Sequence, residues 1–191
     1  DHIMIEQAGK KNDYSFTTLR RKIENKHLEK RLFLLGTDRF GRDMLSRMIL
    51  GTRISLSVGF IAVLISLIVG ISLGSVAGYF PGKIDSFIMW LINVVWSVPS
   101  LLLVIALTMV LGKGFWQIFV AVGLTMWVEV ARVVRGQVKS ESKKEYVEAA
   151  IVLGVNKFNI LFRHILPNII SPVIIISAAN FASAILIEAG L

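Results

Sequence analysis

Three long stretches of this sequence contain no charged residue, and they constrain the fold more than any other feature. They are residues 54–78, 86–112 and 165–187, and a shorter apolar run, 114–128, ends at Glu129. A helix of about 20 apolar residues crosses the ~30 Å hydrocarbon core of a membrane. We therefore predict an all-α chain, a polytopic bundle of transmembrane helices with about four spans.

The basic residues flank these apolar runs, and this position indicates that they contact lipid. Of the 191 residues, 54% are hydrophobic, yet the formal net charge is +8. Lys and Arg gather in residues 10–53 and 132–163, beside the predicted spans. Basic residues at such positions set orientation and contact anionic lipid head groups. We expect the lipid bilayer as a partner and, without a basic-aromatic module, no nucleic acid.

The residues that would indicate a metal or a cofactor are missing from the sequence. There is no cysteine, and the three histidines are widely separated. No phosphate-binding loop of the Walker type occurs. We therefore expect no metal site, no cofactor and no disulfide.

The chain divides into a polar segment, residues 1–53, and a membrane core, residues 54–191. We expect a loop at the beginning of the polar segment, followed by a helix over residues 17–34. A short interfacial helix begins at Asp43, a suitable N-cap. Its apolar stripe consists of Leu45, Met48 and Ile49. Because the sequence begins with Asp1 and stops beside a span, we expect the native chain to continue at both ends.

Small residues recur every four positions in the first span. Ser66, Gly70, Gly74 and Gly78 line one helix face. Such a face lets another helix backbone approach closely, so we predict a packing site.

The same glycines produce the pattern G-x-S-x-G around Ser72, which is typical of serine hydrolases. A serine nucleophile needs a base within reach, and no histidine is placed beside it by the sequence. An intramembrane protease is therefore a weaker alternative than helix packing.

Polar residues within the spans are candidates for a transport pathway. Pro99 kinks a helix and frees a backbone carbonyl, and broken helices inside membranes line cavities or pack against protein. Asn93, Ser97 and Asn180 are the accompanying candidates, although hydrogen bonding between packed helices explains them equally well.

Acidic residues in the spans allow a second function class. Glu129 and Arg132 are three residues apart, and we expect them to pair near the membrane interface. Alternatively, Glu129 or Glu188 carries protons in an ion-coupled secondary transporter.

An interrupted, charged double helix lies between two apolar runs, at residues 145–168. Glu145 to Leu153 favours a helix, and Gly154 suits the left-handed residue that ends it. Asn156 suits the N-cap of a second helix, which Pro167 separates from the last span. The apolar stripe predicted for this second helix comprises Phe158, Leu161, Phe162 and Ile165. We predict a fixed elbow at the membrane surface that docks another protein.

This elbow resembles the EAA motif of the membrane subunits of bacterial ABC importers. The resemblance rests on Glu148-Ala149-Ala150, on Gly154 after three intervening residues, and on Leu166-Pro167. The sequence His-Ile-Leu-Pro-Asn, which begins at His164, resembles the dipeptide, oligopeptide and nickel branch of that family. The stretch LGTDRFGRDMLSRMILGTRISL resembles the entry to its "C"-type subunits.

The resemblance implies a fold of the type I ABC importer permease kind in the bacterial cytoplasmic (inner) membrane. Residues 1–53 would be extracytoplasmic, and residues 136–166 would form the cytoplasmic coupling loop. The residues expected to couple to an ATPase are Glu145, Glu148, Ala149, Ala150, Gly154, His164 and Pro167.

The implied function is that of a permease for di- or oligopeptides, with nickel or another small solute as the alternative substrate. The implied partners are a second homologous permease, two ATPase subunits and an extracytoplasmic solute-binding protein. ATP hydrolysis would then occur in the separate ATPase, and this chain would not itself be an enzyme.

Overall fold

The computed structural model describes residues 2–7, 10–26, 32–112 and 114–190. The chain forms two compact units, residues 1–49 and residues 50–191, and each is described by itself below.

The first unit begins with an antiparallel hairpin that the sequence did not lead us to expect. Strands β1 (His2–Gln7) and β2 (Lys10–Ser15) pair in register, and helix α1 (Phe16–Lys26) follows at once. The predicted helix over residues 17–34 is therefore confirmed in its first part only, and residues 27–31 lie outside the described chain. The residues before it form strands where we expected a loop.

A tight loop closes the first unit, and Asp38 organises it. The Asp38 carboxylate accepts hydrogen bonds from the amides of Phe40, at 2.8 Å, and Arg42, at 3.0 Å. It also pairs with the guanidinium groups of Arg42 and Arg47. These donors, the Arg42 amide foremost, hold the pKa of Asp38 well below its usual range. Asp43 accepts from the Leu45 amide at 3.2 Å, as an N-cap does.

Helix α2 (Met44–Tyr79) runs without interruption from this cap through the first predicted span. The separate interfacial helix that we expected at Asp43 is instead the first turns of α2. Gly51, the glycine closest to the expected boundary, has a helical backbone conformation. The helix therefore continues through it without a break.

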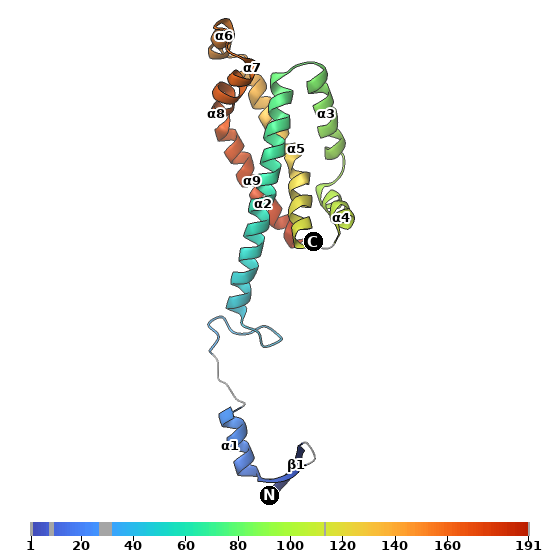
Figure 1. The fold of residues 1–191 in the computed structure, drawn as a ribbon, viewed down its shortest axis with the longest axis vertical. Helices are drawn as coiled ribbons and strands as arrows, with labels where there is room; N and C mark the ends of the chain where they lie inside the picture. Colours follow the sequence, from blue (N-terminus) through green and yellow to red (C-terminus); the bar gives the residue numbers. More distant parts are fainter. Residues whose placement is uncertain (1, 8–9, 27–31, 113, 191) are drawn as a thin grey trace. The chain divides into compact units, whose positions relative to one another are not determined.

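The second unit is entirely helical (Figure 1). After α2, its α-helices are α3 (Lys83–Trp96), α4 (Ser100–Leu111), α5 (Phe115–Glu141), α6 (Glu145–Val152), α7 (Lys157–Asn159), α8 (Leu166–Asn168) and α9 (Ile170–Ala189), with a π-helix, η1 (Ile160–Ile165), between α7 and α8. The all-α prediction for the membrane core is confirmed.

Helices α2, α5 and α9 are each long and apolar enough to cross a membrane, while α3 and α4 meet at a bend of 90°. Arg135 near the end of α5 donates to Asp85 in the first turn of α3, with Nη2 and Oδ2 at 2.7 Å. The start of α3 therefore lies at the end of the bundle where α5 finishes. If the bent pair α3 and α4 is counted as one span, the described residues contain four candidate spans, and otherwise three, by length and composition.

Helices α2 and α5 approach closely along the face of α2 that carries the predicted small residues. A methyl group built on Gly74 would lie 2.5 Å from the Ala131 carbonyl oxygen, and one on Gly78 would lie 2.8 Å from that of Arg135. At Gly70 the same addition would meet Val130. Ser66 is buried in the same row, and its hydroxyl donates to the Val63 carbonyl at 2.9 Å.

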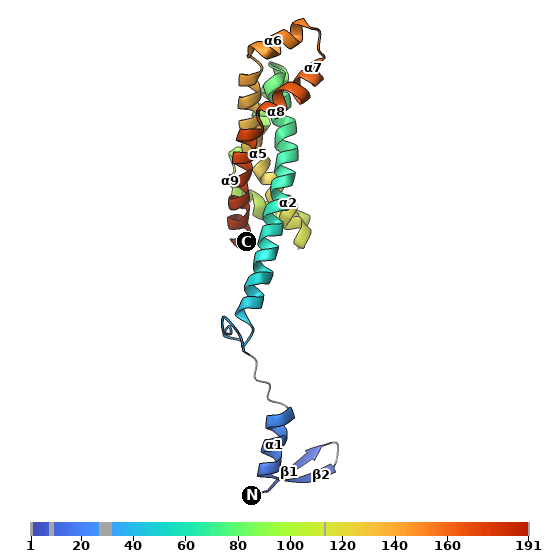
Figure 2. The same cartoon turned by 90° about the vertical axis from the view of Figure 1, so that its left-hand side faces the viewer.

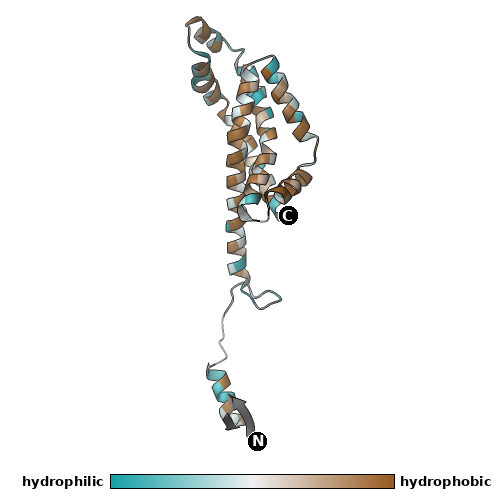
Figure 3. Ribbon diagram, turned by 45° about the vertical axis from the view of Figure 1, so that its right-hand side comes forward, coloured by the Kyte–Doolittle hydropathy of each residue, from teal (hydrophilic) through white to brown (hydrophobic). Residues whose placement is uncertain are grey.

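Helix α5 is the centre of the second unit and contacts α3, α4 and α9. Its inward residues are fully buried, whereas α2, α4 and α9 expose many large apolar side chains. Figure 3 shows that apolar residues dominate these helices. Outward apolar faces are typical of helices surrounded by lipid or by further membrane helices.

Candidate coupling elbow and membrane pocket

The elbow lies at the end of the bundle where α5 finishes and α9 begins (Figure 2). The Phe80 ring, in the turn after α2, lies 6.4 Å from the Phe158 ring of α7. The elbow and the α2–α3 turn therefore share one end of the membrane core.

The first arm, α6, ends in a Schellman motif. Gly154 has φ +75°, a conformation that only glycine adopts at little steric cost. Its amide donates to the Ile151 carbonyl at 3.0 Å, and the Val155 amide donates back to the Ala150 carbonyl at 3.0 Å. Val155 and Ala150 also belong to one apolar cluster. The end of this arm is therefore fixed by local backbone geometry.

The second arm begins at Asn156, whose side-chain oxygen accepts the Phe158 amide at 3.0 Å. The helix then passes from α7 into the π-helix η1, where the Leu166 amide donates to the Leu161 carbonyl five residues earlier. Single π-turns inside α-helices occur frequently at functional sites.

The π-helix changes which residues face the core. Ile160, Leu161, Ile165 and Ile169 are buried, whereas Phe158 and Phe162 are 63% and 61% exposed. The predicted stripe is therefore wrong at its two phenylalanines. The prediction assumed an α-helix with 3.6 residues per turn. The wider turn of the π-helix η1 instead places residues five positions apart on the same face.

A chain of hydrogen bonds holds the two arms to the end of α5. The Tyr146 hydroxyl donates to Glu141 Oε2 at 2.8 Å, and Lys144 Nζ donates to Glu141 Oε1 at 2.7 Å. Asn168 Nδ2 reaches the Tyr146 hydroxyl at 3.4 Å and the His164 carbonyl at 2.6 Å. Burial and the Glu141 carboxylate raise the pKa of Tyr146.

The sequence did not reveal Glu141, Tyr146 and Asn168 as a group. They come from three elements, and their separations of 5 and 22 residues match no helical or strand period. The positions of Tyr146 beside the EAA motif and of Asn168 directly after Pro167 were the available signals.

The predicted coupling residues differ in exposure. Glu145, Glu148, Ala149, Gly154, His164 and Pro167 are exposed, whereas Ala150 is only 7% exposed and packs inside the elbow. Val152 and Leu153 are 86% and 81% exposed at the end of the first arm. The outward surface therefore combines two carboxylates with an apolar tip.

A second group of predicted residues meets where α3 and α4 separate. Pro99 and Ser97 stand in the break itself, and Asn93 lies one turn before it. The Arg132 guanidinium donates to Asn93 Oδ1 at 3.2 Å and lies 3.3 Å from the centre of the Trp96 ring. Asn180 is separate from this group, buried on α9 without a hydrogen-bond partner among the described residues.

The expected pair between Glu129 and Arg132 does not form. Arg132 contacts Asn93 and Trp96 instead, and Glu129 has no ion pair within the described part of the chain. Glu129 also lies at the middle of α5 rather than at its end.

Ser72, the candidate nucleophile, and Glu188, the other candidate proton carrier, each form a hydrogen bond with a residue of a membrane helix. Ser72 donates its hydroxyl to the Ile68 carbonyl at 2.7 Å, one turn earlier on the same helix. Glu188 accepts a hydrogen bond from Ser55 at 2.9 Å. Both contacts are those of residues that join or stabilise helices.

Comparison with known proteins assigns a family. The model of the family described as the binding-protein-dependent transport system inner membrane component matches residues 70–191. The chain is 40% identical to the oligopeptide transport system permease protein OppC of Bacillus subtilis, over 81% of this chain and 50% of that protein. It is 43% identical to the dipeptide transport system permease protein DppC of the same species, over 82% and 50%.

A third relative is the glutathione transport system permease protein GsiD of Pectobacterium atrosepticum, 38% identical over 82% of this chain and 52% of that protein. The chain thus spans about half the length of the curated relatives it matches. The family match covers more than half of the chain, and it includes helices α3, α4, α5 and α9 and the whole elbow. This chain therefore belongs to the family of inner membrane components of binding-protein-dependent transport systems.

Proposed function

We propose that this chain forms the core of a permease subunit of an ATP-driven importer for di- or oligopeptides. The observation that carries the proposal is the elbow, a preformed two-arm structure with an exposed tip at one end of a helical membrane bundle. The names of three relatives, which transport oligopeptides, dipeptides and glutathione, support peptides as the substrate class.

The elbow would act as a lever between an ATPase and the membrane helices. Its exposed tip, Val152 and Leu153 with Glu145 and Glu148, offers an apolar contact edged by negative charge. Its second arm leads directly into α9, and its polar contacts tie it to α5. A displacement of the tip would therefore move two membrane helices together, as a rigid-body transition requires.

The complete transporter would contain a second homologous permease, two ATPase subunits and an extracytoplasmic binding protein. In this arrangement ATP is hydrolysed in the ATPase subunits. The present chain supplies half of the path and the coupling contact. The elbow would face the cytoplasm, and the beginning of α2 would face the other side.

The proposal is tested by purifying the full-length protein with its native partners and reconstituting the complex in vesicles. We expect an ATPase and a second permease in the complex, and peptide uptake that requires ATP and the binding protein. A protonophore at constant ATP should leave uptake unchanged. Uptake that collapses with the proton gradient and proceeds without ATP would establish an ion-coupled carrier and refute the proposal.

A further inference from the structure

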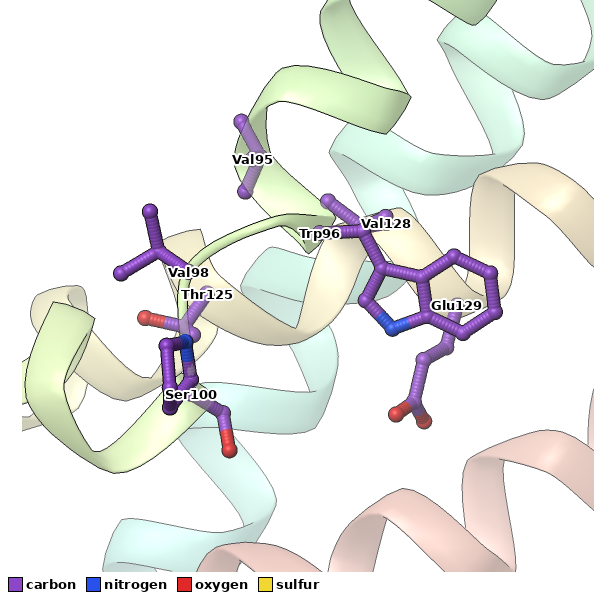
Figure 4. A pocket seen from close by; sticks show the side chains of 8 residues that line it. Val95, Trp96, Val98, Ser100, Thr125, Val128 and Glu129 are labelled. Carbon is purple, nitrogen blue, oxygen red and sulfur yellow. The ribbon is translucent and has the colours of Figure 1, made fainter.

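A pocket opens beside the break between α3 and α4, against the middle of α5 (Figure 4). Its walls include Trp96, Pro99, Ser100 and Thr125, and Glu129 carries the only charge among the lining residues. The cavity measures about 170 Å³. A cavity of about 150 Å³ can hold a molecule the size of benzene. The pocket therefore has room for one small organic group.

Glu129 enters this pocket without a charge partner. It is exposed, and no ion pair to it occurs within the described residues. Charged groups inside a membrane face protein or water-filled cavities, because exposure to lipid is costly. The carboxylate is thus positioned for a ligand or for another protein surface.

No ion pair joins this acid to the cation on the next turn of α5. Arg132 is one helical turn away, but its guanidinium is hydrogen-bonded to Asn93 at 3.2 Å and stacked 3.3 Å from the Trp96 ring centre. Both contacts hold Arg132 on the α3 side. Among the lining side chains Glu129 therefore carries one negative charge, and the Arg132 guanidinium lies against the Trp96 ring of the same pocket.

These features favour an organic ammonium over a metal ion. Metal cations such as Ca²⁺ take six to eight oxygen ligands, and no group of three acidic or histidine side chains occurs in the described chain. A single carboxylate with apolar and aromatic walls instead matches one ammonium group and the carbon atoms next to it.

We propose that Glu129 binds the protonated amino terminus of a peptide during its passage through the membrane. This inference rests on the proposed function, and it adds the part of the substrate that the membrane path recognises. The amino group pairs with the carboxylate, and the first side chain occupies the space between Trp96 and Pro99. Thr125 donates its hydroxyl to the Ala121 carbonyl and leaves its lone pairs available to the ligand.

The test uses a thiol introduced into the pocket, and residues 1–191 contain no other cysteine. Ser100→Cys in the assembled complex is labelled with a water-soluble maleimide, and incorporation is measured from the mass of the proteolytic peptide that contains residue 100. We expect trialanine at millimolar concentration to slow labelling several-fold, and N-acetyl-trialanine, which lacks the ammonium group, to have little effect. In Glu129→Gln the two peptides should behave alike, whereas Glu129→Asp should keep part of the difference.

Glu188→Gln is the matched control, because it removes another acid from a membrane helix outside the pocket. It should leave the difference between the peptides intact. Equal protection by both peptides, as expected if a partner permease already pairs with Glu129, would overturn the inference. A thiol that is never labelled, or a difference that survives Glu129→Gln, would overturn it too. These outcomes do not depend on ATP, so they are separate from a failure of ATP-driven uptake.

Discussion

The hydroxyl of Tyr146, in the first turn of α6, donates to Glu141 Oε2, at the last residue of α5, over 2.8 Å. This bond joins the membrane core to the arm that we propose docks the ATPase. Glu141 is only 9% exposed, so its carboxylate depends on this donor and on Lys144 for hydrogen bonds. The elbow is therefore attached to α5 by polar contacts as well as by packing.

Replacing Tyr146 by Phe should loosen the first arm. Loss of one partner of a buried acceptor costs about 1–3 kcal/mol. We expect faster amide hydrogen exchange over residues 145–153, with the transmembrane helices unchanged. Tyr79→Phe is the matched control, because no hydrogen bond of the Tyr79 hydroxyl occurs among the described residues. Equal exchange in the two variants would show that the Tyr146 bond does not hold the arm.

Replacing Gly154 by Val should reduce peptide uptake for each ATP hydrolysed, with the complex still assembled. A side chain at Gly154 meets no atom within 4 Å, so the effect arises from its φ of +75° alone. The left-handed conformation costs a residue other than glycine about 1–2 kcal/mol. Gly154→Asn should retain more coupling, because Asn tolerates this conformation.

Gly136→Ala is the control for the Gly154 variants, since it also adds a side chain in open space but on a regular helix. Uptake and ATP hydrolysis should remain at the original ratio. If Gly154→Val also keeps that ratio, the elbow is not the coupling element.

Replacing Gly74 by Ala should destabilise the membrane core. The new methyl group would lie 2.5 Å from the Ala131 carbonyl oxygen, so α2 and α5 must separate. Overpacking of this kind costs about 1–3 kcal/mol. We expect a lower midpoint of thermal unfolding in detergent. Gly51→Ala on the same helix meets no atom within 4 Å and should not lower the midpoint, since alanine favours a helix more than glycine does.

The Asp38 loop should lose order in acid. Because the pKa of Asp38 is held well below its unfolded value of about 3.9, mainly by the Arg42 amide, its stabilising effect is complete above that value. It is lost as the pH falls from there towards the folded pKa. Amide exchange over residues 38–44, corrected for the intrinsic pH dependence, should show increasing opening below about pH 4.

Asp38→Asn removes this titration and should give a loop whose corrected exchange does not vary with pH. A pH response that persists in Asp38→Asn would assign the acid sensitivity to another group.

Features encoded within a few residues could be predicted from the sequence. Gly154 and Asn156 were recognised as the end of one helix and the start of the next, because such caps depend on local backbone geometry and nearby hydrogen bonds. The break at Pro99 was recognised because proline lacks an amide hydrogen. The N-terminal hairpin was not predicted, since neither strand alternates: β1 contains three consecutive apolar residues, Ile3 to Ile5, and β2 is mostly polar.

The sequence by itself determined a helical membrane protein with about four crossings and a charged elbow, because apolar run length and capping residues are local properties. Only the tertiary structure decided that Arg132 turns to Trp96 and Asn93 and leaves Glu129 unpaired. It also decided the π-turn of η1 and the chain of contacts from Glu141 through Tyr146 to Asn168. These features depend on contacts between side chains of different helices. The spacing of residues within one helix does not specify such contacts.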